Sequence, residues 1–173
     1  MAVTNINNVF HLKVTIEWAG KTRGNPYRTI AIPQNASLYN LAEAIIDSFD
    51  FDFDHAFGFY NNLKDWYRSI VGYELFTDIG EGSKFPGVKK TRLLKVFTEL
   101  KTKMLFMFDY GDEWCFIVQL VKITDFDKNI KYPVITDSFG DAPPQYDYND
   151  EDYDDDDFDD DEIDYDNEKK PQK

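Results

Sequence analysis

Within residues 9–18, apolar and polar side chains alternate without a break from Phe10 onward. A period of two is typical of a strand that buries one face and exposes the other. The buried face is expected to carry Phe10, Leu12, Val14, Ile16 and Trp18, and the exposed face His11, Lys13, Thr15 and Glu17. After a connection with two glycines and Pro26, the segment Tyr27–Ile32 again places two isoleucines on one side. The pattern predicts an opening hairpin that ends at Pro33.

The period changes to that of a helix at residue 38. Apolar residues three and four positions apart form one stripe on a helix, and here they are Leu38, Leu41, Ala42, Ile45, Ile46 and Phe49. Ser37 is placed to cap the first turn of this helix, which is predicted over residues 38–49. A shorter helix is predicted over Thr91–Leu100, where apolar residues return at helical spacing and Gly and Pro are absent.

Several other segments favour strands. A ring-rich stretch predicts a strand near residues 56–61, and a further strand is expected near Tyr73–Phe76. The segments Lys103–Phe108 and Glu113–Ile123 are apolar on both alternating faces, as in central strands covered on each side. A Tyr-Gly-Asp turn joins them into a hairpin, and Gly111 is expected to supply a positive φ there. The pattern as a whole predicts a mixed α+β domain.

Charge divides the chain unevenly. Residues 141–173 contain 16 acidic and 3 basic residues, whereas residues 1–140 contain 17 acidic and 16 basic ones. Like charges at the density found after residue 146 repel one another too strongly to collapse around a few rings. We therefore expect a folded domain over 1–146 and a disordered acidic tail over 147–173, which could bind a basic protein partner. A calcium loop in the tail is not expected, because the sixth position lacks glycine.

Several kinds of chemistry find no support in the sequence. The single cysteine, Cys115, excludes a disulfide within the chain and a zinc site built on several thiols. There is no phosphate-binding glycine loop, no nucleophile elbow and no His-Glu-x-x-His helix, so no cofactor and no catalytic residue is assigned. A signal peptide and an apolar stretch long enough to span a membrane are also missing. We expect a cytoplasmic protein that does not contact membranes.

Several ordered motifs resemble the plasmid pRiA4b ORF-3-like family, and the similarity covers roughly residues 9–146. The motifs are the run Phe108-Asp109-Tyr110-Gly111-Asp112-Glu113-Trp114, His55 at the start of a predicted strand, Tyr132-Pro133-Val134, and Gly140-Asp141-Ala142-Pro143-Pro144-Gln145-Tyr146. The resemblance implies an α+β roll, a curled sheet packed on helices, in plasmid- and mobile-element-associated proteins of largely unassigned role. Family members often continue Pro-Pro-Glu-Asp where this chain has Gln145-Tyr146, so a role of that segment in closing a site is not carried over.

The candidate site is the acidic hairpin together with one histidine. His55, Asp109, Asp112 and Glu113 could form a carboxylate and imidazole cluster for a divalent metal or for acid and base catalysis. The structural interpretation is favoured, because Asp residues beside a tight turn accept hydrogen bonds from nearby backbone donors. Tyr110, Gly111 and Trp114 belong to the same candidate set, although Trp114 shares a strand face that predicts burial. Cys115 lies within a strand, where its thiolate is not favoured.

A basic segment spans residues 84–103. Only one acidic residue, Glu99, accompanies its seven cations, which are Lys84, Lys89, Lys90, Arg92, Lys95, Lys101 and Lys103. The segment is either a solvated surface or a binding site for phosphates, with the tail competing for it. The function expected from the sequence is a non-enzymatic binding or adaptor module, with the tail contacting a basic partner or masking this segment. The alternative is a metal-dependent hydrolase or nucleic-acid-processing enzyme that uses the candidate site.

Overall fold

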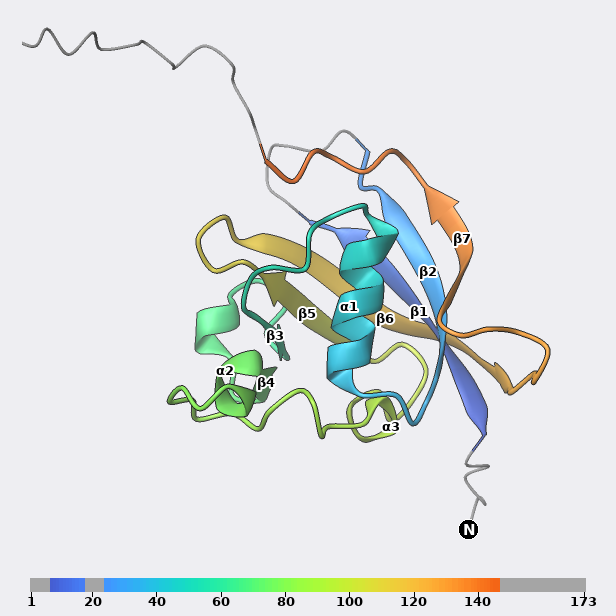
Figure 1. The fold of residues 1–173 in the computed structure, drawn as a ribbon, viewed down its shortest axis with the longest axis horizontal. Helices are drawn as coiled ribbons and strands as arrows, with labels where there is room; N and C mark the ends of the chain where they lie inside the picture. Colours follow the sequence, from blue (N-terminus) through green and yellow to red (C-terminus); the bar gives the residue numbers. More distant parts are fainter. Residues whose placement is uncertain (1–6, 18–23, 147–173) are drawn as a thin grey trace, which may run out of the picture.

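Seven strands form one antiparallel sheet in the order β4-β3-β5-β6-β1-β2-β7 (Figure 1). The computed structural model describes residues 7–17 and 24–146. The strands are β1 (Asn8–Ile16), β2 (Tyr27–Pro33), β3 (Phe57–Tyr60), β4 (Gly72–Glu74), β5 (Lys103–Phe108), β6 (Trp114–Asp125) and β7 (Val134–Phe139). The helices are α1 (Leu38–Ser48), α2 (Leu75–Asp78) and α3 (Leu93–Val96), with a 3-10 turn at Trp66–Arg68. The sheet curls beside α1, which confirms the predicted α+β roll.

The opening hairpin is confirmed. β1 pairs antiparallel with β2, with Leu12 opposite Ile30 and Phe10 opposite Ile32. The apolar positions of β1 from Phe10 to Ile16 are all buried, whereas His11, Lys13 and Thr15 between them are half-buried. Trp18 and most of the connection to β2 lie outside the described residues. β1 also pairs along its whole length with β6, so the first strand occupies the middle of the sheet.

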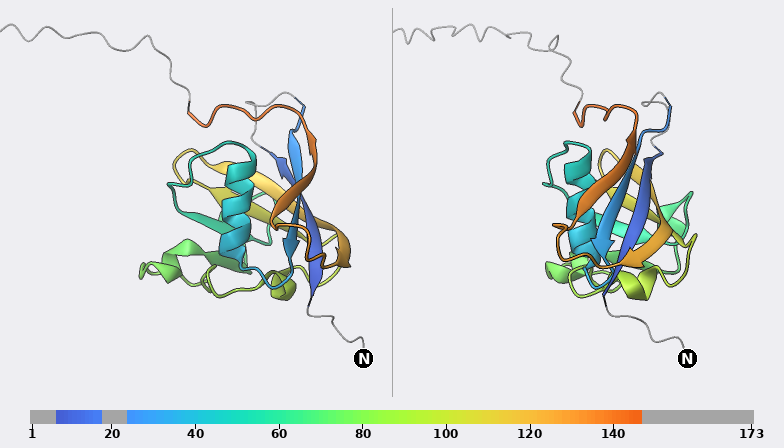
Figure 2. Two further views of the ribbon diagram at one scale, coloured as in Figure 1. Left: turned by 45° about the vertical axis from the view of Figure 1, so that its right-hand side comes forward. Right: turned by 90° about the vertical axis from the view of Figure 1, so that its right-hand side faces the viewer.

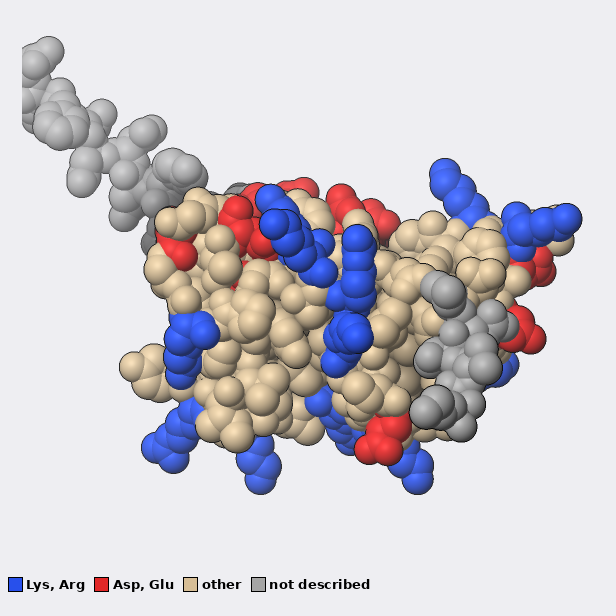
Figure 3. Space-filling model, turned by 90° about the horizontal axis from the view of Figure 1, so that it is seen from below, with Lys and Arg blue, Asp and Glu red and all other residues tan. Residues whose placement is uncertain are grey.

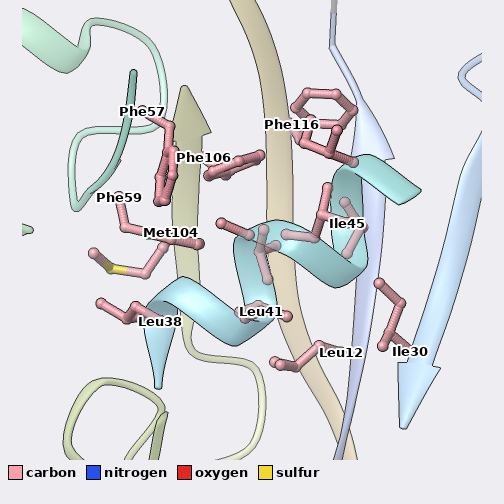
Figure 4. Close-up of a cluster of buried hydrophobic side chains, with 14 of the residues drawn as sticks. Leu12, Ile30, Leu38, Leu41, Ile45, Phe57, Phe59, Met104, Phe106 and Phe116 are labelled. Atoms are coloured by element: carbon pink, nitrogen blue, oxygen red, sulfur yellow. The ribbon is translucent and has the colours of Figure 1, made fainter. Parts of the chain in front are cut away.

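Helix α1 covers one face of the sheet (Figure 2). Its first turn is held by the predicted cap, because the Asn40 backbone amide donates to Ser37 Oγ at 3.1 Å. The Asn40 side chain in turn accepts from the Ser37 amide at 3.2 Å, which completes a capping box. The apolar stripe of α1 is buried against β1, β3, β5 and β6 (Figure 4). Rings dominate this core, for example Phe106 and Phe116 with centroids 5.6 Å apart.

The opposite face of the sheet carries a second, smaller core. Tyr60, Leu105, Met107 and Ile117 are buried there under side chains that include Trp66, Phe85 and Tyr110. This arrangement confirms that β5 and the first half of β6 are covered on both faces. The end of β6 differs, since Val121 and Ile123 are each 41% exposed. The second half of the strand therefore projects beyond the two cores.

The second helix is much shorter than predicted. α3 ends at Val96, and Leu100, which was expected on its buried stripe, is 52% exposed. The chain must turn at this point to enter β5: Lys101 adopts a positive φ of 72° and its amide donates to Leu120 O at 2.8 Å. The strand expected at 73–76 is also shorter, because β4 ends at Glu74 and the following residues form α2.

Two features of the backbone were not predicted. The turn between β5 and β6 places its positive φ angles at Asp109 (58°) and Glu113 (53°), and Gly111 has no positive φ, so that expectation was wrong. Aspartate tolerates the left-handed region better than most residues, because its side chain bonds to the local backbone. The second feature is β7, which pairs with the outer edge of β2 after a cis Tyr132–Pro133 peptide bond.

Candidate functional site

Asp109 organises the turn between β5 and β6. Its Oδ1 accepts hydrogen bonds from the amides of Gly111 at 2.9 Å and Asp112 at 3.4 Å. Its own carbonyl accepts from the Glu113 amide at 2.7 Å, and its amide donates to Ala56 O at 3.0 Å. The residue is buried. These bonds are the backbone capping expected under the structural interpretation of the acidic turn.

The second oxygen of Asp109 faces His55. His55 Nε2 lies 3.5 Å from Asp109 Oδ2, and His55 Nδ1 lies 2.7 Å from Asp54 Oδ1. The imidazole also meets the Phe108 ring edge to face, with centroids 5.9 Å apart. The fold therefore brings together two of the predicted site residues and adds a carboxylate that sequence reasoning missed. The imidazole thus lies between two carboxylates, with one ring nitrogen facing each of them.

The last described residues bond to the loop that carries His55 and Asp54. Gln145 Oε1 accepts from the Asp52 amide at 2.6 Å, and Gln145 Nε2 donates to Asp52 O at 3.2 Å. Tyr146 donates its hydroxyl hydrogen bond to Asp54 Oδ2 at 3.0 Å. Burial together with this hydrogen bond raises the pKa of Tyr146 to about 12. Gln145 and Tyr146, where the chain departs from the family pattern, thus pack against the loop that holds His55.

The Asp54 carboxyl is acidified by this arrangement. Partial desolvation acts to raise its pKa, but hydrogen bonds from His55 and Tyr146 outweigh that effect and lower the pKa below the usual value. Asp54 therefore stays ionised and accepts from both neighbours. Its side chain remains half exposed.

Tyr110 points to the other face of the sheet and joins a buried chain of hydroxyl groups. Its oxygen lies 2.6 Å from that of Tyr60, whose hydroxyl donates to Glu74 Oε1 at 2.6 Å. Because a hydroxyl carries one proton, Tyr110 must be the donor to Tyr60. Ser83 donates to the second oxygen of Glu74. Burial raises the pKa of both tyrosines, so the chain stays protonated.

Sequence reasoning missed Tyr60 and Glu74. The one hint in the sequence was Gly58, a glycine within a predicted strand, which often marks a close approach of other groups. In the structure a Cβ at Gly58 would lie 2.6 Å from Tyr60 Oη and 2.9 Å from Tyr110 Oη. The two hydroxyl groups therefore occupy space that is free only because residue 58 has no side chain. Glu74 is 9% exposed, and nothing in its local sequence distinguishes it from a surface carboxylate.

The remaining candidates point in different directions. Asp112 is exposed on the outside of the turn. Glu113 Oε1 accepts from Trp66 Nε1 at 3.3 Å, on the face opposite α1. Trp114 is buried in the main core, as predicted, with its ring 4.7 Å from that of Phe51. Within residues 7–17 and 24–146, no three or more His, Cys, Asp or Glu side chains are grouped so that they could hold a metal ion.

The seven cations of the basic segment are all exposed. They lie on the loop before α3, on α3 itself, on the turn into β5 and, for Lys103, at the first position of β5. None of them forms a salt bridge with another residue that the structure describes. Two lie near rings, with Lys84 Nζ 4.8 Å from the Phe85 centroid and Lys89 Nζ 5.4 Å from that of Tyr39.

The basic segment and the last described residues lie at opposite ends of the domain. In Figures 1 and 2 the loop before α3 and α3 run along the bottom, whereas the segment that ends at Tyr146 lies at the top. Figure 3 views the molecule from below, and Lys and Arg side chains are spread over that face while acidic ones gather mainly at its margins. None of the described helices is long and apolar enough to cross a membrane.

Comparison with solved structures supports the fold. The chain is similar to the crystal structure of the protein of unknown function MM3350 from Methanosarcina mazei Go1, with a TM-score of 0.65 and 24% sequence identity. The match covers 81% of this chain and 74% of that one. No curated protein matches the chain. A family model described as plasmid pRiA4b ORF-3-like protein matches residues 8–153. The chain therefore belongs to the plasmid pRiA4b ORF-3-like family, as its hairpin and C-terminal motifs indicated.

Proposed function

We propose that this protein is a charge-based adaptor, with the basic segment binding nucleic-acid phosphates and the acidic tail binding a basic protein. The observation that carries the proposal is the exposure of seven cations with no salt bridge to a described residue. Phosphate contacts by Lys and Arg supply most of the affinity in binding that is independent of sequence. This role does not require side chains that recognise particular bases.

The position of the last described residues favours an adaptor over self-masking. The last anchored residues, Gln145 and Tyr146, bond to Asp52 and Asp54 at the end of the domain away from the basic segment. A domain of this size is roughly 35 to 40 Å across, so a tail that masks the basic segment must reach across about that distance. A tail that binds a second partner needs no such constraint.

The test is a titration of labelled duplex and single-stranded DNA and RNA with the full chain between about 50 and 200 mM KCl. Replacement of Lys90, Lys95 and Lys103 by Gln is expected to weaken binding about tenfold or more at low salt and to flatten the salt dependence. A matched control replaces three exposed lysines outside the segment, Lys122, Lys128 and Lys131, and is expected to change binding less than about threefold. Equal losses in both variants, or no binding by the full chain, would exclude the proposal.

A tail variant separates the adaptor from self-masking. Replacing seven acids by Asn (Asp154, Asp155, Asp156, Asp157, Asp159, Asp160 and Asp161) keeps the length of the chain and removes much of its charge. The adaptor predicts that nucleic-acid affinity at about 150 mM KCl changes less than about threefold, whereas masking predicts a clear gain. Cleavage of the labelled strands when magnesium is added would instead support the enzyme alternative at His55 and Asp109.

A further inference from the structure

A cleft of about 380 Å³ lies on the face of the sheet opposite α1. Its floor is formed by Leu105 of β5 and Cys115 of β6, and the loop at residues 63–66 forms one wall. The volume is at the lower end of the range for pockets that hold small molecules, which is roughly 300 to 1,000 Å³. The cleft suits a single side chain or a small organic group. It is separate from the His55 group and from the basic segment.

Two carboxylates reach the cleft from different strands. Glu17 follows β1, and its amide donates to Cys115 O at 2.9 Å, so it continues the pairing of β1 with β6. Glu113 precedes β6, and its side chain lines the same cleft as that of Cys115. Both side chains line the cleft and both are exposed to solvent. The sheet register thus places two negative charges at one opening.

Trp66 supplies an aromatic wall in a fixed orientation. Its indole N–H donates to Glu113 Oε1 at 3.3 Å. Its ring packs against Tyr60 at 5.6 Å and against Tyr110 at 5.1 Å, so the hydroxyl chain on this face supports it from behind. An aromatic face beside carboxylates is the combination that attracts organic cations, through the ring quadrupole and through charge-assisted hydrogen bonds.

The balance of charge in the cleft is negative. Asp65 is paired with Arg68 at 3.2 Å, which leaves Glu17 and Glu113 against Lys64 alone among the charged lining residues. The thiol of Cys115, on the floor of the cleft, is close enough to both carboxylates to be affected by their charge. Burial, followed by the charges of Glu113 and Glu17, raises the pKa of Cys115 to about 11. Both carboxylates therefore act at the position where a ligand would sit.

We propose that this cleft binds an organic cation that carries a short apolar stem, either an alkylguanidinium or an alkylammonium group. The stem lies along Trp66 and Leu105, and the charged head lies between Glu17 and Glu113. Such a group exists both as a free small amine and as the side chain of Arg or Lys in another protein. The proposal is independent of nucleic-acid binding by the basic segment, because the two surfaces share no residue.

The experiment is an NMR titration of the full chain with n-butylguanidinium, n-butylammonium and the uncharged isostere n-butylurea. The indole N–H signal of Trp66, assigned by its loss in Trp66→Phe, is the readout. Saturable binding of the cations with a Kd on the order of 1 mM is expected for a ligand of this size. The urea is expected to bind at least about tenfold more weakly, because it lacks the charge that the carboxylates attract. Equal binding of the urea, or no saturable shift with either cation, would overturn the proposal.

Matched variants test whether Glu17 and Glu113 bind the cation. Glu17→Gln and Glu113→Gln are each expected to weaken cation binding about fivefold or more, and the amide introduced by Glu113→Gln still offers an acceptor to the Trp66 indole. Glu81→Gln, an exposed acid outside the cleft, is the control and is expected to change binding less than about twofold. Equal affinities in all three variants would contradict the site. A blocked tripeptide centred on arginine then identifies the source, since tighter binding than n-butylguanidinium indicates a protein side chain.

Discussion

The hydroxyl oxygens of Tyr60 and Tyr110 lie 2.6 Å apart, although the two residues are 50 positions apart in the sequence. Tyr60 belongs to β3, and Tyr110 belongs to the turn that carries the family motif. Their contact, continued to Glu74, ties that turn to β3 and to the edge strand β4. The tyrosine of the motif is therefore a structural link between this turn and two strands, and its ring also packs against Trp66.

Removal of either hydroxyl is expected to destabilise the fold by different amounts. Tyr110→Phe removes the terminal donor and should cost about 1 kcal/mol. Tyr60→Phe leaves the buried Glu74 carboxylate with one donor fewer and isolates Tyr110, so about 2 to 3 kcal/mol is expected. Urea unfolding of both single variants and of the double variant measures the coupling. Additive losses would show that the two hydroxyls do not act as one chain.

Gly58→Ala is expected to destabilise the domain by about 1 to 3 kcal/mol. The added methyl group would lie 2.6 Å from Tyr60 Oη and 2.9 Å from Tyr110 Oη, so the buried pair must move. Gly82→Ala is the matched control, because no heavy atom lies within 4 Å of a Cβ at that position. Thermal unfolding followed by circular dichroism compares the two. Similar melting temperatures would mean that the tyrosines move aside without loss of packing.

The cap of α1 is expected to contribute measurably to stability. Ser37→Ala removes the acceptor for the Asn40 amide and should cost about 0.5 to 2 kcal/mol in urea unfolding. Ser37→Asp retains an acceptor and is expected to stay within about 0.5 kcal/mol of the parent. An equal loss in both variants would point to the tight packing around the buried Ser37 rather than to the hydrogen bond.

Cys115 is expected to react slowly with neutral alkylating reagents. With its pKa raised to about 11, the thiolate fraction at pH 8 is roughly one part in a thousand. Because the folded state disfavours the thiolate, the unfolded chain ionises first, and stability is expected to fall as pH rises from about 9 towards 11. Glu113→Gln should lower the pKa and speed alkylation at constant pH, which mass spectrometry can follow on the single cysteine of the chain.

The elements that depend on local pattern could be predicted from the sequence. The alternation of β1 and the stripe of α1 are repeated many times within a few residues, and each repeat specifies the same buried face. The structure confirmed both. The motif around Tyr110 also placed the β5–β6 hairpin correctly. Periodicity fails where few residues carry it, as in α3, which ends at Val96 before the turn in which the Lys101 amide donates to Leu120 O.

The site geometry depends on contacts between residues far apart in the chain. His55 meets Asp109 only because β3 pairs with β5, and Asp54 meets Tyr146 across 92 positions. Nothing in the sequence beside Trp66 indicates that it meets the turn of the family motif, and nothing beside Glu74 indicates that Tyr60 links it to that turn. The basic segment, in contrast, could be predicted from composition alone. The fold adds that this segment and Tyr146 lie at opposite ends of the domain.

The side chain of Gln145 bonds to both the amide and the carbonyl of Asp52, as a neighbouring strand residue would. Side-chain hydrogen bonds therefore attach the end of the described chain to Asp52 and Asp54. The next contacts are His55 and, through it, Asp109. Consecutive side-chain contacts thus link the last described residues to the hairpin of the family motif.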